Sequence, residues 1–246
     1  MQKAFYPEGT DLAHLYLLHP PGGIVSGDAL QIDIDCEANA QTLVTPPGAG
    51  RIYRARDTFP RQQQRVAINV AEGACVEWFP LETIVFDGAC VELATTVNLA
   101  RGGHYIGWEV TCFGLPASEA PLRHGSFRQR YRIMHDGMPV YVDGLDINQT
   151  NMTDLLQGPA TLRSNPVLGV FLAGPFDSAQ GTALVKTLRE TPTDEPGDVS
   201  LTGDFLVGRY LGDSAERARQ LFGLWWQQVR PALLQRPACA PRIWLT

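Results

Sequence analysis

The sequence predicts a mainly β fold of many short strands, with two α-helices in the C-terminal half. Apolar and polar residues alternate with period two in the first 150 residues, as in half-buried strands; the clearest stretches are 30–35, 66–70 and 91–99. Glycine and proline gather between such stretches, at 20–23, 46–50 and 102–103, which is typical of turns. After about residue 150 the pattern changes, and helical spacing appears.

A hairpin is predicted at 126–147, because Asp136-Gly137 is a favoured two-residue turn. With that loop, Arg130 faces Asp143 and Arg132 faces Tyr141. One face then carries Arg128, Arg130 and Arg132, and the core face carries Tyr131, Ile133, Val140 and Val142. The arginine row is either an anion-binding surface or a solvated face with one Arg130–Asp143 pair, and we favour the solvated face.

A short internal echo lies in the middle of this β-rich part. The pentapeptide at 73–77, Gly-Ala-Cys-Val-Glu, recurs at 88–92. This spacing would suit stacked rungs of a helical β architecture, although chance can also produce a single such pair.

The segment 104–113 is predicted to be a central strand, since both of its faces are largely apolar. Glu109 stands in its middle. A buried carboxylate is unfavourable unless it is paired, liganded or protonated. Glu109 therefore belongs either to an internal polar network or beside a water-filled channel.

The C-terminal part is predicted to alternate strands and helices. Residues 167–173 form a continuous apolar run typical of a buried strand, and 201–211 returns to strand, whereas 151–160 is ambiguous. One helix is predicted at 178–189. The longer helix runs from Asp213 or Ser214, either of which can cap it, to about Leu234, with a kink or end near Arg230 imposed by Pro231. Its apolar stripe consists of Ala218, Leu221, Phe222 and Trp225. The apolar tail at 241–244 should dock on the body.

Composition excludes several classes of protein. The 246 residues suit one large domain or two small ones, and the net charge of −6 gives no overall attraction to nucleic acid or an anionic membrane. The five cysteines are odd in number and show no C-x-x-C spacing, so neither a disulfide framework nor a structural zinc site is expected. The N-terminus shows no apolar signal region, and the apolar stretch 166–174 is too short to span a bilayer. We expect a cytoplasmic protein.

Motif searches find no enzyme signature. The glycine-rich segment 19–28 lacks the lysine of a phosphate loop and does not match G-x-S-x-G. It is better explained as a tight link between two strands. The five histidines form no H-x-H or H-E-x-x-H pair, and His14 and His19 fall on opposite faces of a strand.

Several blocks, in order along nearly the whole chain, resemble the UreD (UreH) family of urease accessory proteins. They are Phe5 to Gly9, Leu15 to Val25 with Gly27-Asp28, Thr45 to Ala49 with Tyr53-Arg54, Glu77 to Phe86, and Pro241 to Thr246. The resemblance implies a single domain over 1–246 with a β-solenoid core, β-rich over 1–175 and helix–strand–helix over 176–246. It also implies a missing N-terminal segment, because family members carry several tens of residues before the Phe-Tyr-Pro block.

The resemblance implies a function as well. The chain would be a non-catalytic scaffold that joins UreF and, through UreF, the GTPase UreG in a dimeric accessory complex on apo-urease, and supports nickel insertion there. It would hold no stable cofactor and at most transient nickel. The alternatives are a β-helical or cupin-like enzyme, using Asp28, Glu109 or Asp143 as acid or base, and an anion- or carbohydrate-binding module using the arginine row.

Three acidic residues are the candidate metal ligands. Asp28, Glu109 and Asp143 each occur in a segment that is otherwise predicted to be a glycine-rich turn or a core strand. Carboxylate oxygens and water suit transient binding of a divalent ion, whereas a cage of histidine and cysteine would hold nickel too firmly. We expect these residues to line an internal polar route for nickel. The competing expectation is that Arg130 neutralises Asp143 and that Glu109 is bonded internally.

Overall fold

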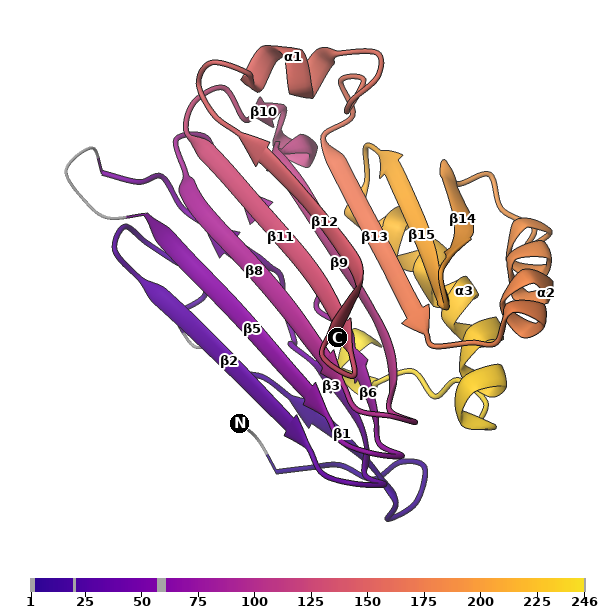
Figure 1. Cartoon of the computed structure of the whole chain (residues 1–246). Helices are drawn as coiled ribbons and strands as arrows, with labels where there is room; N and C mark the ends of the chain where they lie inside the picture. The colour runs from indigo at the N-terminus through magenta and orange to yellow at the C-terminus, as the bar shows by residue number, and fades with distance from the viewer. Residues whose placement is uncertain (1–2, 20, 57–60, 246) are drawn as a thin grey trace.

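Strands dominate the computed structural model, which describes residues 3–19, 21–56 and 61–245. Pro20 of the glycine-rich segment and Thr246 of the C-terminal block lie outside these ranges. Within them the strands form two sheets (Figure 1). The first sheet follows the order β1-β3-β6-β9-β13-β15-β14, with β7 and β10 also beside β9 and β4 beside β7. The second follows β12-β11-β8-β5-β2.

The strands have the following bounds. The first sheet contains β1 (Leu12–Tyr16), β3 (Gln41–Thr45), β4 (Gly50–Ile52), β6 (Cys75–Trp78), β7 (Glu82–Val85), β9 (His104–Leu115), β10 (Ala120–Pro121), β13 (Val167–Gly174), β14 (Gly197–Thr202) and β15 (Phe205–Gly212). The second contains β2 (Ala29–Cys36), β5 (Gln62–Val70), β8 (Cys90–Leu99), β11 (Ser126–His135) and β12 (Met138–Ile147).

The two sheets are built by a solenoid path. The chain passes from one sheet to the other and back, so that β1, β3, β6 and β9 stack in parallel in the first sheet, and β2, β5, β8 and β11 stack in parallel in the second. The hairpin strand β12 and the antiparallel strands β13 to β15 then extend the two sheets. The mainly β, solenoid-like fold is therefore confirmed.

The internal echo does not mark stacked rungs. Both copies form a tight turn that leads into a strand, with Gly73 at φ +68° and Gly88 at φ +82°. However, the first copy begins β6 in one sheet, and the second begins β8 in the other. In both copies the repeated residues form the corner before a strand, but the two corners lie on opposite sides of one coil of the solenoid.

The predicted hairpin forms, but its register differs from the expected one. The turn lies at Asp136-Gly137, yet a β-bulge shifts the pairing, so that Met134 faces Pro139 while Ile133 faces Tyr141. Proline has no N–H to give to the ladder, and strands commonly bulge beside it. The predicted pairs of Arg130 with Asp143 and of Arg132 with Tyr141 are therefore wrong.

This one-residue shift reverses the faces that the side chains of β12 occupy. Tyr141 is buried, whereas Val142 is 60% exposed, contrary to the prediction that Val142 faces the core. Asp143 now lies opposite Tyr131 and shares its inward side.

Three α-helices occur in the described residues: α1 (Met152–Gln157), α2 (Ser178–Arg189) and α3 (Ala215–Leu234). The helices α2 and α3 confirm the two predicted ones. Ser214 caps α3, its hydroxyl accepting from the backbone N–H of Arg217 at 3.3 Å. The helix ends at Leu234, as predicted, and it does not end near Arg230, because Pro231 falls in the last turn and interrupts little of the helix. The ambiguous segment 151–160 holds α1, which is too short to show helical periodicity.

The predicted strand over 201–211 is instead a hairpin. The chain turns at Gly203, whose φ is +57°, and this separates β14 from β15. Both strands belong to the first sheet, beyond β13.

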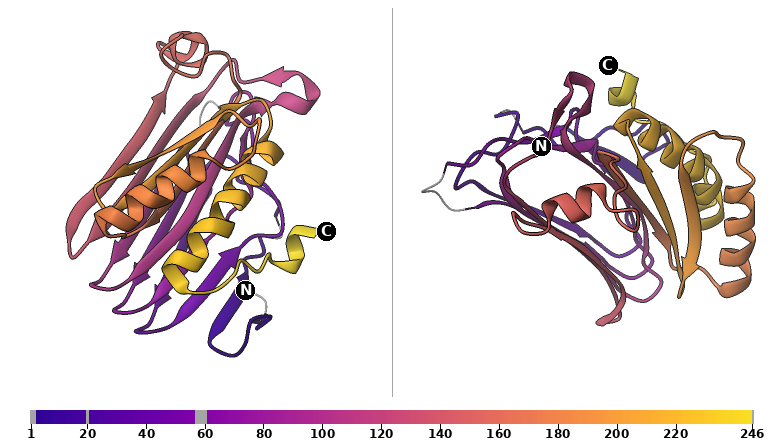
Figure 2. Two further views of the ribbon diagram at one scale, coloured as in Figure 1. Left: turned by 90° about the vertical axis from the view of Figure 1, so that its right-hand side faces the viewer. Right: turned by 90° about the horizontal axis from the view of Figure 1, so that it is seen from above.

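The helices α2 and α3 cover the outer face of the first sheet, away from the second sheet (Figure 2). The apolar stripe of α3 packs there against alternate residues of β9: Ile106, Trp108, Val110 and Cys112. The C-terminal tail docks as predicted: Trp244 packs edge-on against Phe79, with ring centroids 5.9 Å apart, and donates to the hydroxyl of Thr45 at 3.0 Å. Among the described residues, no helix combines the length and apolar character that crossing a membrane requires.

Candidate functional site

A polar layer divides the space between the two sheets into two apolar clusters. Strand β8 illustrates the division: Val91 and Leu93 belong to one cluster, Val97 and Leu99 to the other, and Thr95 stands between them. The face of β9 that is turned away from α3 contributes Glu109 and Thr111 to the same layer, and both residues line a cavity between the sheets. Inward positions in a sandwich are normally apolar, so this polar layer needs a reason other than stability.

Glu109 is held at the centre of the layer. It accepts hydrogen bonds from the hydroxyl of Thr95 at 2.5 Å and from the side-chain amide of Gln129 at 2.7 Å. Burial raises the pKa of Glu109 to about 7, although these two hydrogen bonds act in the opposite direction. Glu109 therefore exchanges a proton near neutral pH.

Asp143 enters the same space from the second sheet. The bulge in β12 turns its side chain inward, where Arg209 of β15 donates to it at 2.8 Å and the Tyr141 hydroxyl at 3.0 Å. Burial alone would raise the pKa of Asp143, but the hydrogen bond and positive charge of Arg209 outweigh it and lower the pKa below its ordinary value. Asp143 therefore remains a carboxylate.

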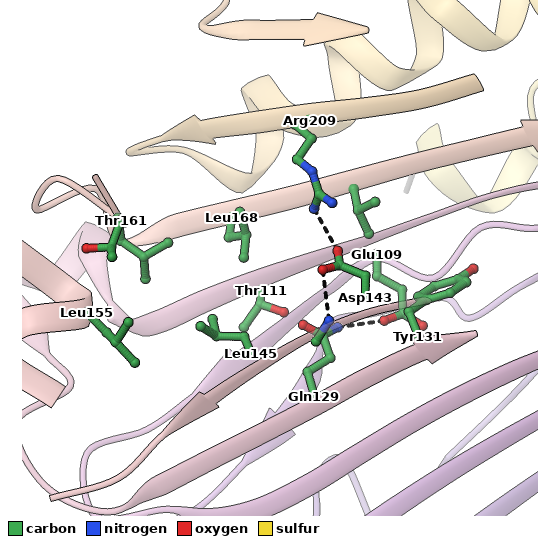
Figure 3. Close-up of a pocket in the computed structure, with 13 residues that line it drawn as sticks. Glu109, Thr111, Gln129, Tyr131, Asp143, Leu145, Leu155, Thr161, Leu168 and Arg209 are labelled. Carbon is green, nitrogen blue, oxygen red and sulfur yellow. Dashed lines mark hydrogen bonds and ion pairs between the residues drawn. The ribbon is translucent and has the colours of Figure 1, made fainter. Parts of the chain in front are cut away.

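Glu109 and Asp143 line one cavity of about 240 Å³, which we call the inner cavity (Figure 3). It lies between β9, β13 and β15 on one side and β11 and β12 on the other, with α1 near its end. The polar residues of its wall are Glu109, Thr111, Gln129, Tyr131, Asp143, Thr161 and Arg209.

Two further cavities continue from the inner cavity along the solenoid. A narrow cavity of about 20 Å³ shares Glu109, Thr111 and Gln129 with it. An outer cavity of about 390 Å³ shares Gln64, Trp78, Pro80, Leu81 and Thr83 with the narrow one. The three cavities are thus neighbours between the sheets, from Asp143 and Arg209 to the first coils of the solenoid, and Glu109 lines both the inner and the narrow cavity.

The glycine-rich segment forms part of the outer cavity. Gly22 and Gly23 line it, together with the second proline- and glycine-containing turn at 46–50. A side chain at Gly23 would collide with the ring of Tyr53 and lie 2.8 Å from the carbonyl oxygen of Arg51. The glycine is thus required for close backbone approach at this mouth, in agreement with the predicted tight link.

Asp28 lies apart from the other two candidate residues. Its side chain is exposed in the turn before β2, where it accepts from the backbone N–H of Val25 at 3.0 Å. It does not belong to the described lining of the three cavities. The structure brings together Glu109 and Asp143, but not Asp28.

Sequence reasoning missed three residues of the site. Gln129 lies on the same face of its strand as Tyr131 and Ile133, so the predicted core face of the hairpin already contained a polar residue that points inward. Thr95 stood within a recognised period-two face in the same way. Arg209 carried no local signal, because its pairing with Asp143 joins residues 66 positions apart.

The arginine row of β11 is a partly solvated face with ion pairs, as favoured from the sequence, but with another partner. Arg128 pairs with Asp146 at 2.8 Å, and Arg130 reaches the same carboxylate at 3.8 Å.

Comparison with known proteins identifies the family. A sequence model described as UreD urease accessory protein matches residues 1–245. A protein from Psychromonas ingrahamii named Urease accessory protein UreD is 43% identical, over the whole of this chain and 85% of the relative. A protein of the same name from Marinomonas sp. (strain MWYL1) is 41% identical, over the whole chain and 81% of the relative. This chain therefore belongs to the UreD family of urease accessory proteins.

Proposed function

We propose that this chain is a non-catalytic scaffold that carries nickel towards apo-urease through its three consecutive cavities. The family places the chain in urease maturation. The observation that supports a conduit is the meeting of Glu109 and Asp143 in one cavity, with Glu109 also lining the next.

The chemistry of the wall suits cargo rather than a resident ion. Its charged ligands are carboxylate oxygens, which bind divalent ions but release them more readily than thiolate and imidazole ligands do. Asp143 is already paired with Arg209, which weakens its hold on a cation. Glu109 can take up a proton as an ion leaves, since its pKa is about 7.

The assembly partners in this proposal follow from the family. The chain binds UreF and, through UreF, UreG, in a dimeric accessory complex that docks on apo-urease in the cytoplasm. Nickel is cargo, and no stably bound cofactor takes part in its delivery. Nucleotide hydrolysis belongs to UreG, so the purified chain, free of UreG, should hydrolyse neither GTP nor ATP.

Conservative substitutions test the conduit. Glu109→Gln and Asp143→Asn keep the size of each side chain and remove its charge. Both should preserve folding and UreF binding and lower the nickel content of urease several-fold in cells grown at limiting nickel. Asp33→Asn, on the exposed side of β2, is the matched control and should behave as the parent. Parental nickel content in both cavity variants would rule the conduit out.

A further inference from the structure

A second group of metal-ligating side chains lies away from the cavities. Glu8 precedes β1, His14 is within β1, and Cys239 follows α3 near the end of the chain. One potential ligand atom of each lies within 4.8 Å of the other two. The group thus combines oxygen, nitrogen and sulfur ligands from the two ends of the chain.

The spacing of these atoms is close to that of a metal site. A tetrahedral ion with metal–ligand distances of 2.0–2.3 Å holds its ligand atoms roughly 3.5 Å apart. His14 Nε2 and Glu8 Oε1, which are 2.8 Å apart, would separate slightly, and the sulfur of Cys239, which lies within 4.8 Å of them, would approach by about 1 Å. Cys239 can supply that movement, because it lies in the irregular segment between α3 and a 3₁₀ turn at Arg242–Leu245 and is only partly buried.

His14 brings one ring nitrogen into this group. Its side chain is fully buried, and its Nε2 lies 2.8 Å from Glu8 Oε1. Nε2 is therefore the nitrogen that the imidazole can offer to a metal ion held together with Glu8.

The surrounding charges would be balanced by a divalent ion. Arg230 donates to both oxygens of Glu8, at 2.7 and 2.8 Å, and to Glu77 at 3.0 Å. One guanidinium therefore faces two carboxylates. With Cys239 as a thiolate, three negative groups would face Arg230 and the ion, and these charges cancel. Arg230 can keep Oε2 of Glu8 while Oε1 turns to the metal.

We propose that Glu8, His14 and Cys239 form a divalent-metal site for an ion of borderline softness such as Zn²⁺, with water at the fourth position. The ligand set of thiolate, imidazole and carboxylate favours such ions over Mg²⁺ or Ca²⁺. Bound metal ties the segment before β1 to the segment after α3. The site lies outside the three cavities and does not depend on the proposed conduit.

Cobalt titration of the full chain tests the site, because a thiolate–Co²⁺ bond gives a charge-transfer band that oxygen ligands in the cavities cannot give. One Co²⁺ per chain should produce this band, and Zn²⁺ should displace it. Cys239→Ser should abolish the band, whereas Cys90→Ser, at a partly buried cysteine outside the group, should keep it. The absence of the band from the parent, or its survival in folded Cys239→Ser, overturns the proposal.

A measurement on the unmodified chain covers the case in which Cys239→Ser does not fold. Alkylation with iodoacetamide, followed by peptide mass mapping, reports the reactivity of each cysteine. Zn²⁺ should slow the alkylation of Cys239 many-fold and leave that of Cys90 unchanged. Equal alkylation of Cys239 with and without Zn²⁺ contradicts the site, whatever the outcome for nickel delivery.

Discussion

Two carboxyl groups that share one cavity are set to different protonation states by their immediate neighbours. Glu109 has neutral hydrogen-bond donors, Thr95 and Gln129, and its pKa rises to about 7. Asp143 faces Arg209, and its pKa falls. A single cavity thus offers a fixed negative charge and a group that gains or loses a proton near neutral pH.

The raised pKa of Glu109 predicts a pH-dependent stability. The pKa of Glu109 is 4.5 in the unfolded chain and about 7 in the folded protein. Between these two pH values the folded state binds more protons than the unfolded state, so the free energy of unfolding falls as pH rises. The full contribution is at most about 3 kcal/mol. Urea unfolding of the parent and of Glu109→Gln from pH 4.5 to 8 measures it. The variant should gain relative stability as pH rises, and parallel curves would contradict the prediction.

At the residue scale, the sequence could identify some site residues but not their partners. Glu109 stood out because its strand is otherwise apolar. Asp143 was a candidate because the sequence placed it in a core hairpin opposite Arg130. In the structure it faces inward because of the bulge beside Pro139, and its partner is Arg209. A bulge shifts every later side chain, and the alternating pattern of a hairpin does not reveal it.

At the scale of single elements, α3 shows how packing overrides a local preference. Pro231 cannot donate a hydrogen bond, yet the helix continues to Leu234. The preceding turns bury Trp225, Trp226 and Val229 against the first sheet, which holds the helix in register up to the proline.

This observation predicts that Pro231→Ala stabilises the protein. The side chain of Pro231 is exposed, so alanine loses little packing and restores a backbone donor within the last turn. The expected gain is about 1 kcal/mol, below the full helix-interior penalty of proline because the site is near the helix end. Thermal unfolding of the parent and variant measures it. An unchanged or lower melting temperature would show that the proline supports the turn that follows α3.

Elements with strong local signals were predictable, and those defined by long-range pairing were not. The helices α2 and α3 and the strand β13 follow from periodicity, a capping serine and a continuous apolar run. The division of 197–212 into β14 and β15, and the assignment of successive strands to opposite sheets, depend on which strands pair. That information is absent from any one segment. The family resemblance implied the solenoid-like core, but neither this hairpin nor the assignment of each strand to a sheet.

At the scale of the whole molecule, a buried ion network joins distant parts of the chain. Arg230 of α3 contacts Glu77 of β6 and Glu8 before β1, and Trp226 donates to Glu77 at 2.7 Å. The side chain of Arg230 is fully buried. Buried charges of this kind depend strongly on their partners.

Replacement of Arg230 should therefore lower the free energy of unfolding far more than replacement of one carboxylate does. Arg230→Met leaves two carboxylates without their shared partner and should destabilise the fold by about 3–5 kcal/mol. Glu77→Gln keeps an acceptor for Trp226, and Glu8 still neutralises Arg230, so its effect should be clearly smaller. Urea unfolding at pH 7.5 compares the two variants. Similar losses in both would show that Glu77 alone matters as much as the shared cation, and would contradict the prediction.

The polar layer between the sheets has a consequence for how this protein can evolve. Filling the layer with apolar side chains would remove voids and unfavourable buried groups, as in many stabilising designs. A variant with Thr95→Val, Glu109→Leu and Gln129→Leu should melt at a higher temperature than the parent and yet fail to support urease activation at limiting nickel. A lower melting temperature would show that the layer itself stabilises the fold. Under the proposed function, selection keeps this polar layer for nickel transfer although it lowers the stability of the fold.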